Sequence, residues 1–455
     1  MSQVTGSGVT KARSAVTIGA FTAVYFVLMW CSGMLGFFGP AFMFVGWIIG
    51  LILNGPVIML MLVRSRMFGT LTIMGSIVAL LMVLTGHSWV TLPVTLVLGF
   101  LADLVARSGG YLNASRNIAA YMLVSLWMIG PLAPIFFAPD SYYADIASSM
   151  GQDYADSMRA LFSPAVIGGW LVAAMIIASL VGSSAASCYA STSLRPALPE
   201  ISPAESAPGE SPSRLDPRTK LLALLVLNAL VMRASPTTTL IAVQVLVVAA
   251  LAWEVSTKSA LRIGFGCLIC DVIYLGSPLL VTWMQSAAWP HPVALTIGTC
   301  AAIMYWFARF FAGFGLALYV YRTTRIGQMK AALRAAHLPR IFVDALVVAF
   351  RVIPTVGAEA VAIREAMQMR GVDLSTRGVL RHPLVIAEQF LVPLLSSIAR
   401  VADDLAASSV VRGLGSSTRP TSLTQLRATG WDALALVCVA AVIALEYCCY
   451  LGILP

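Results

Sequence analysis

The sequence has few charged residues: only 11% of its 455 residues are Asp, Glu, Lys or Arg, whereas soluble domains carry roughly 25%. Apolar residues make up 59% of the chain. This balance excludes a protein that is surrounded by water along most of its length. The eight cysteines also lack the paired spacing of a disulfide scaffold, because most of them stand inside apolar runs.

Motifs for nucleotide binding and for hydrolysis are missing as well. A phosphate-binding loop ends in Gly-Lys-Ser or Gly-Lys-Thr, but none of the four lysines follows a glycine. No HExxH or GxSxG motif occurs, and only four histidines are present. We therefore expect no catalytic residues, no bound cofactor and no metal site in this chain. Cys267 and Cys270 have CxxC spacing, but they lie in an apolar run without other ligands, which favours ordinary packing.

Apolar runs long enough to cross a bilayer are abundant, since a helix needs roughly 20 such residues to span it. The predicted fold class is therefore all-α: a polytopic membrane protein with about eleven transmembrane helices and additional amphipathic cytoplasmic helices. No small-residue cleavage site follows the first run, so we expect a span and not a signal peptide. The predicted spans lie near 16–38, 41–63, 69–86, 89–106, 117–138, 164–187, 219–233, 237–253, 263–285, 294–320 and 431–453.

The basic residues predict the orientation of these spans, because Lys and Arg accumulate in cytoplasmic loops. In the first half, basic residues lie before the first predicted span, after the second and after the fourth. The long loop 139–163 carries four Asp and a single basic residue, Arg159. Between 322 and 427 there are fourteen Lys or Arg and seven Asp or Glu, which places this stretch in the cytoplasm. We expect a multi-pass protein of the bacterial cell membrane, with a cytoplasmic N-terminus and an external C-terminus. Topology thus explains the net charge of +9 without a nucleic-acid partner.

A segment rich in Ser, Pro, Ala and Glu separates two apolar halves at 191–213. It has no periodicity that could bury a face, which is typical of a flexible linker. We predict one membrane domain at 1–190, a cytoplasmic linker at 191–213 and a second domain at 214–455.

Two helical segments in the stretch 322–430 finish in the same way. The run 341–350 is apolar, yet Arg351 and Pro354 cut it below spanning length, so we expect it to lie against other helices or the membrane interface. Apolar residues then recur with helical spacing, and each segment ends in Arg-Gly. An Arg near a helix C-terminus also offsets the helix dipole and needs no partner. Spacing alone leaves this alternative open. The residues concerned are Val356, Ala360, Ile363 and Met367 before Arg370-Gly371, and Leu394, Ile398, Val401 and Leu405 before Arg412-Gly413.

The second half resembles the T component, the transmembrane coupling subunit, of energy-coupling factor transporters. The resemblance is carried by RLDPRTKLLALL, by ALRAAHLPRIFVDALVVAFRVIPTVGAEAVAIREAMQMRGVD and by ARVADDLAASSVVRGLG, over 214–455. It implies that Arg370, Gly371, Arg412 and Gly413 dock into two ATPase subunits, which bind ATP and Mg²⁺ in place of this chain. Met369 and Val411 stand where the family usually has a small residue.

The first half resembles a Trep_Strep-like membrane family of substrate-binding S components. VTIGAFTAVYFVLM, FGTLTIMGSIVALLMVLTGHSW, FLADLVARSGGY and SLWMIGPL carry this likeness across about 10–190. The chain is therefore similar to an S component fused to its T component. The resemblance implies an ATP-driven uptake transporter with a small-molecule substrate, such as a vitamin-like or tetrapyrrole micronutrient. Cobalt and nickel S components begin with Met-His, whereas this chain begins Met1-Ser2-Gln3, which disfavours free metal.

Candidate substrate residues lie where the first half is expected to face outward: Trp30, His87, Trp89, Tyr142 and Tyr143. Aromatic side chains at this depth are equally typical of interfacial anchors. Three carboxylates near or within spans, Asp103, Asp271 and Glu446, are costly placements whose roles stay open. Two other functions also remain: a membrane enzyme that acts on a lipid-linked substrate, and a passive channel. The first would need a cluster of polar catalytic residues, and the second would not need the two Arg-Gly helices.

Overall fold

The computed structural model of the chain describes residues 6–38, 40–84, 90–137, 139–150, 152–191, 215–232, 237–286, 291–375, 378, 381, 383–413 and 429–451. Every regular element in these ranges is a helix, and they contain no strand. The prediction of an all-α polytopic membrane protein is confirmed. The linker 191–213 lies almost entirely outside the described residues.

The helices of the first half follow the predicted apolar runs with one difference. The predicted span 117–138 is divided by a short 3₁₀ turn, because Pro131 has no amide hydrogen to continue the helix and instead stands in the first turn of a new one. The elements are α1 (Gly6–Gly33), η1 (Met34–Phe38), α2 (Pro40–Ser65), α3 (Thr70–Leu84), α4 (Thr91–Ser108), α5 (Ala114–Ser125), η2 (Leu126–Met128), α6 (Ile129–Phe137), α7 (Pro139–Met150), α8 (Gln152–Leu161) and α9 (Pro164–Ser191). The acidic loop 139–163 thus forms the short helices α7 and α8.

The second half contains eight helices within the described residues. They are α10 (Pro217–Met232), α11 (Thr237–Glu254), α12 (Thr257–Ser286), α13 (His291–Thr323), α14 (Ile326–Ala335), α15 (Arg340–Met369), α17 (Pro383–Val411) and α18 (Gly430–Tyr450). Helix α10 begins at Pro217, directly after Asp216, whose carboxylate accepts a hydrogen bond from the Arg218 amide at 2.9 Å.

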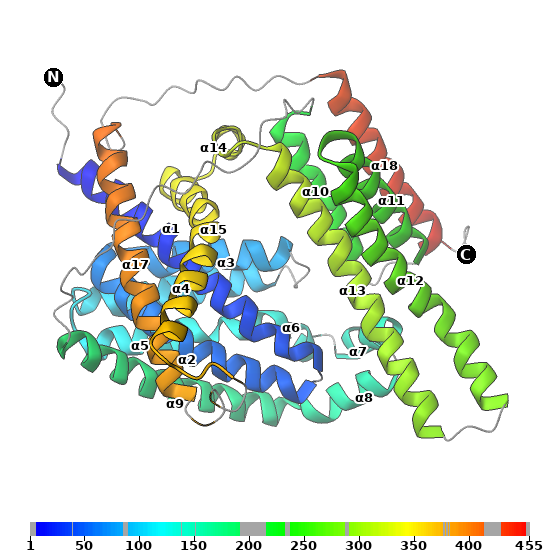
Figure 1. Cartoon of the computed structure of the whole chain (residues 1–455), viewed down its shortest axis with the longest axis horizontal. Coiled ribbons are helices and arrows are strands. Elements are labelled where there is room, and N and C mark those ends of the chain that lie inside the picture. Colours follow the sequence, from blue (N-terminus) through cyan, green and yellow to red (C-terminus); the bar gives the residue numbers. More distant parts are fainter. Residues whose placement is uncertain are drawn as a thin grey trace.

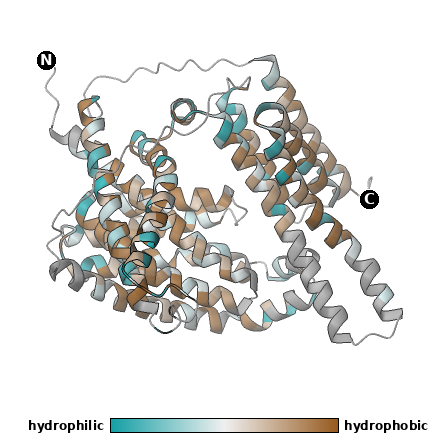
Figure 2. Ribbon diagram, viewed as in Figure 1, coloured by the Kyte–Doolittle hydropathy of each residue, from teal (hydrophilic) through white to brown (hydrophobic). Residues whose placement is uncertain are grey.

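Two large apolar cores hold most of these helices together, and a third, smaller cluster packs α7 and α8. One core is formed by α10, α11, α12, α13 and α18, which gather on one side of the molecule (Figure 1). The other combines helices of the first half with the buried faces of α15 and α17. Helix α1 is the centre of this second core, because 72% of its most apolar window is buried, against 17% for α18. Figure 2 shows apolar residues along most of the helices, with hydrophilic residues at α14 and at the upper ends of α10 and α11.

Helix α15 corrects the prediction that Arg351 and Pro354 end the apolar segment. The helix continues through Pro354 from Arg340 to Met369. Val352 and Val356 are buried on either side of the proline, so packing outweighs the lost backbone hydrogen bond and the ring clash of an interior proline, which together cost about 3 kcal/mol. Pro393 stands inside α17 in the same way. The expectation that the 341–350 run lies against other helices is confirmed, since Ala345 and Leu346 belong to the core around α1.

Nine helices in the described ranges are long and apolar enough to cross a membrane, so the predicted count of eleven is not confirmed. The nine include α15 and α17, whose apolar residues pack on α1. The shorter α3 and α10, the divided α5 and α6, and the partly described α13 are not among them. The orientation of the spans and the domain boundaries stay predictions.

Of the three costly carboxylates, Asp103 has a defined structural role. Its side chain accepts hydrogen bonds from the Leu71 amide at 3.0 Å, the Thr72 amide at 2.9 Å and the Thr72 hydroxyl at 2.6 Å. It thereby satisfies amides in the first turn of α3 and fastens α4 to that turn. Asp271 accepts a hydrogen bond from Gln244 at 3.4 Å between α12 and α11, and Glu446 is half-buried in α18.

Candidate functional site

The first Arg-Gly ending forms the C-terminus of α15. Gly371 has a φ of +76°, which an L-residue with a side chain rarely adopts. Its amide donates to the Gln368 carbonyl at 3.0 Å, and the Val372 amide donates to the Met367 carbonyl at 3.1 Å. These two bonds are the Schellman pattern, so the predicted glycine cap is confirmed. The Arg370 side chain is exposed at this turn.

The second Arg-Gly ending forms the C-terminus of α17 with the same geometry. Gly413 has a φ of +87°, and its amide donates to the Val410 carbonyl at 2.9 Å. The Arg412 side chain is exposed. The repeated sequence ending therefore corresponds to a repeated backbone turn that presents an Arg to the solvent.

Each exposed Arg follows an exposed apolar side chain. Met369 is 83% exposed and Val411 is 88% exposed, and these are the largest exposed fractions among the exposed large apolar residues of α15 and α17. At each ending the apolar side chain and the neighbouring Arg are both accessible to a partner. Helices α15 and α17 run in opposite directions (Figure 1), so their two ends lie at opposite ends of the helix pair. The dipole alternative does not account for the exposed Met369 and Val411.

The surroundings of the first ending carry a second polar feature. Asp373 follows Gly371 in the connection after α15, and its carboxylate accepts a hydrogen bond from the Ser375 amide at 2.9 Å. Hydrogen bonding from Ser375 lowers the pKa of Asp373, because it favours the ionised form. An ionised carboxylate is therefore present near Arg370 throughout the physiological pH range.

The opposite faces of α15 and α17 pack on α1 of the first half. The closest approach is at Gly19, where an added Cβ would collide with the Ala345 carbonyl oxygen and would lie 2.8 Å from the Val348 Cβ. Glycine is required here because the two backbones meet directly. Small residues at such a point let two helices pack closely inside a membrane protein. The two helices thus carry exposed Arg-Gly ends and a face that is buried against the first half.

The structure brings some of the predicted substrate residues together and leaves others apart. Tyr142 and Tyr143 are adjacent on α7 with ring centroids 5.5 Å apart, and both belong to an apolar cluster with Phe162. Trp30 is half-buried near the end of α1 and stacks on Phe26 at 5.8 Å. His87 and Trp89 lie outside the described residues, so their assignment stays a prediction.

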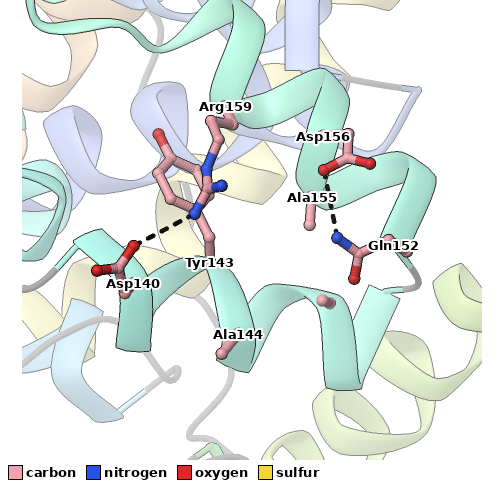
Figure 3. A pocket seen from close by; sticks show the side chains of 8 residues that line it. Asp140, Tyr143, Ala144, Gln152, Ala155, Asp156 and Arg159 are labelled. Carbon is pink, nitrogen blue, oxygen red and sulfur yellow. Dashed lines mark hydrogen bonds and ion pairs between the residues drawn. The ribbon is translucent and has the colours of Figure 1, made fainter.

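A cavity of about 210 Å³ lies between α7 and α8 (Figure 3). Arg159 crosses it from α8, pairing with Asp140 at 3.5 Å while its guanidinium lies 4.9 Å from the centre of the Tyr143 ring. Burial raises the pKa of Tyr143, with a smaller opposing effect from Arg159, so the phenol stays protonated at neutral pH. The lining residues are Asp140, Tyr143, Ala144, Ala147, Gln152, Ala155, Asp156 and Arg159. Small-molecule pockets usually enclose about 300–1,000 Å³, so this one fits a polar group but not a whole tetrapyrrole.

An aromatic cluster next to this hairpin was not predicted. Phe44 stacks on Phe162 at 4.9 Å and contacts Trp170 edge-on at 5.2 Å, and Trp47 lies 5.9 Å from Trp170. The Trp170 Nε1 is buried and has no hydrogen-bond acceptor among the described residues. The spacing of Phe44 and Trp47 on one face of α2 was the available signal, but Phe162 and Trp170 come from the distant end of α8 and from α9.

A buried ionic network also escaped the sequence analysis. Lys220 of α10 lies 3.6 Å from the Glu254 carboxylate of α11 and donates to the Thr323 carbonyl of α13 at 3.3 Å. The Tyr319 hydroxyl donates to the same carboxylate at 2.7 Å. A lysine at the start of an apolar run was the signal, since buried charges need partners. This network joins three helices at one end of the α10–α13 bundle. No group of three or more His, Cys, Asp or Glu placed to hold a metal occurs in the part of the chain that the structure describes.

Two family models match different parts of the chain. Residues 12–190 match the family model described as hypothetical bacterial integral membrane protein (Trep_Strep), and residues 208–421 match the family model described as cobalt transport protein (CbiQ). No curated protein matches the chain. No solved structure matches it either. The order of the two matches is that expected of an S component fused to a T component, and together they indicate a membrane component of a transporter and not an enzyme.

Proposed function

We propose that this chain is the membrane subunit of an ATP-driven uptake transporter of the energy-coupling factor type. The first half captures the substrate, and the second half couples it to two separate ATPase subunits. The observation that carries this proposal is the pair of exposed Arg-Gly endings on two helices whose other faces pack on the first half. The match of residues 208–421 to a transport family supports it.

The chemistry of the endings suits docking into a groove on a partner. A guanidinium offers five donors in a fixed fork, so it can bind carboxylates or backbone carbonyls that Lys would hold less well. The glycine turn directly after each Arg ends the helix. Because glycine has no side chain, little bulk surrounds the Arg at the contact. Because the two endings lie at opposite ends of the helix pair, each one serves a different ATPase subunit.

The packing of the same helices explains how a movement at the ATPases reaches the substrate. Helices α15 and α17 both contact α1 and also contact each other. A displacement of either exposed end therefore moves a rigid helix against the core of the first half. The substrate half responds as a packed body because α1 is its central element.

For the substrate we propose a vitamin-like or tetrapyrrole micronutrient that is captured at the α7–α8 hairpin. The cavity there holds a polar group of the substrate, such as a carboxylate beside Arg159. The adjacent cluster of Phe44, Trp47 and Trp170 offers aromatic faces and an indole N–H for a planar part. A substrate larger than the cavity requires the hairpin to open. Mass spectrometry of the small molecule retained by the purified chain identifies it.

Copurification with ATPases tests the coupling. We expect the double variant Arg370→Glu with Arg412→Glu to lose ATPase subunits and substrate uptake, because each Arg is replaced by the opposite charge. Each charge-assisted hydrogen bond contributes about 1.5–3 kcal/mol, so either single variant should keep partial binding. Substrate binding should persist, since the predicted topology places the α7–α8 hairpin outside the cell and both endings in the cytoplasm.

The matched control is Arg364→Glu, which changes an exposed Arg of α15 less than two turns before its end. This variant should keep the ATPases. Normal ATPase recovery and uptake in the double variant would show that the two arginines only cap their helices.

A further inference from the structure

Three charged side chains join the first half of the chain to α17. The Asp403 carboxylate of α17 lies 2.8 Å from the Arg64 guanidinium of α2 and 3.2 Å from the Arg13 guanidinium of α1. Arg64 also approaches the Ala399 carbonyl of α17 at 3.4 Å. One carboxylate of the second half is thus shared by two arginines from two helices of the first half.

The position of this triad distinguishes it from an ordinary surface ion pair. It lies at the last turn of α2 and near the start of α1, beside Ala399 and Ala402 of the shared apolar core. The Arg64 side chain is only 28% exposed, so it is partly shielded from solvent. Isolated exposed pairs contribute little, but a partly buried carboxylate with two guanidinium partners forms a network.

The surrounding contact between the halves is apolar and made by Leu, Ile, Val and Ala side chains of α15 and α17. Such a surface gives attraction but little direction, because the hydrophobic effect depends on area and not on orientation. Buried polar partners can specify one register among several. Asp403 is therefore the group that selects where α17 sits along α1 and α2.

We propose that Asp403 latches the substrate-binding half to the second coupling helix in one register, through Arg13 and Arg64. Asp403 is nine residues before Arg412, which is about 14 Å along a helix at 1.5 Å per residue. The latch therefore connects the exposed ending of α17 to the first half through little more than two helical turns. This proposal deepens the proposed function and rests on it. It makes Asp403 a positioning residue that fits this first half to its own coupling helix.

The test uses the full chain with a specific protease site inserted in the linker at 191–213 and an affinity tag at the C-terminus. The purified protein is cut in detergent, the second half is immobilised, and the first half that stays bound is measured at about 0.1 M and 1 M salt. We expect the wild-type halves to stay together and to separate more at high salt, because salt screens the triad. Asp403→Arg places three positive charges together, and retention should fall at least fivefold.

Charge exchange provides the readout that a merely structural role would not give. Combining Asp403→Arg with Arg64→Asp should restore retention to within about twofold of wild type. Asp403→Asn should give an intermediate loss and a weaker salt dependence. The matched control is Asp404→Arg, which makes the same change one residue away at an exposed position and should retain the first half as wild type does.

Equal retention for Asp403→Arg and Asp404→Arg at both salt concentrations would overturn the latch. Loss of retention in Asp403→Arg that the Arg64→Asp exchange does not restore would also overturn it. The recovery of ATPase subunits by the uncut variants is measured separately. Reduced retention of the first half with normal ATPase recovery supports this proposal. Absence of ATPases in the wild type contradicts the proposed function. The retention assay still tests the latch in that case, because it does not depend on the ATPases.

Discussion

The two apolar cores of the molecule are held together by different means. The α10–α13 and α18 bundle encloses polar pairs, such as Lys220 with Glu254 and Gln244 with Asp271. The contact of α1 with α15 and α17 is instead close and apolar, and its charged groups lie at its edge. Buried polar pairs tie the helices of the bundle to one another, whereas the contact with α1 depends on close apolar packing and on the charged groups at its edge. The comparison indicates that the second half consists of a rigid bundle and two helices that belong, by packing, to the first half.

The largest effect is expected when the buried ionic network of the α10–α13 and α18 bundle is broken. Lys220→Met removes the charge beside Glu254 and leaves a carboxylate in a site where Lys220 is 1% exposed and Glu254 is 12% exposed. Removing one partner of a buried pair costs about 3–5 kcal/mol. We expect a strongly lowered unfolding temperature in detergent, with retention of the first half reduced only as far as the bundle unfolds.

Lys258→Met serves as the control because Lys258 is exposed. It should change the free energy of unfolding by no more than about 0.5 kcal/mol. Equal unfolding temperatures for the two variants would mean that the network contributes nothing to the bundle.

A smaller effect is expected at the close apolar contact between α1 and α15. Gly19→Leu forces a side chain into the Ala345 carbonyl oxygen, so α1 and α15 must separate. Overpacking of this kind costs about 1–3 kcal/mol. Retention of the first half after cutting of the linker should fall, and uptake with it, while the unfolding temperature of the α10–α13 bundle stays unchanged.

Gly33→Leu is the matched substitution on the same helix, since an added Cβ at Gly33 meets no atom within 4 Å. Retention should be unaffected by it. If both variants retain the first half equally, the close approach at Gly19 does not hold the two halves together.

The smallest effect is expected at the exposed C-terminal turn of α15. Gly371→Ala strains a residue with a φ of +76°, at a cost of about 1–2 kcal/mol, although its Cβ would meet no atom within 4 Å. In this variant, the amide hydrogens of the last turn of α15 should exchange faster. Fewer ATPase subunits should copurify with it. Gly357→Ala, inside the same helix with open space around it, should instead be neutral or stabilising by up to about 1 kcal/mol. Unchanged exchange at the last turn in Gly371→Ala would contradict the cap.

Much of this architecture could be predicted because it depends on local patterns. Apolar length locates α1, α2 and α9, and an Arg-Gly ending predicts a left-handed glycine turn at 371 and 413. The continuation through Pro354 could not be predicted, since it depends on packing against α1, whose residues are more than 300 positions away. Asp403 could be recognised as polar but not as the partner of Arg64, because their pairing exists only once the two halves meet.

The candidate sites were predictable to different degrees for the same reason. Tyr142 and Tyr143 are adjacent in sequence and therefore stay together in the fold. The cluster that extends them is assembled from α2, the end of α8 and α9, and no local pattern connects Phe44 with Phe162 or Trp170. The high exposure of Met369 and Val411 at the two helix ends likewise becomes visible only in the tertiary structure.

The close approach at Gly19 has a consequence for the biosynthesis of the protein. Ala345, which covers Gly19, is synthesised 326 residues later. At about 5–20 residues per second, the ribosome needs on the order of tens of seconds to reach it. During that interval α1, the most buried of the candidate membrane spans in the described part of the chain, presents its glycine face to lipid or to another helix. Because α1 and α15 belong to one nascent chain, α15 is inserted close to α1 and can cover its glycine face.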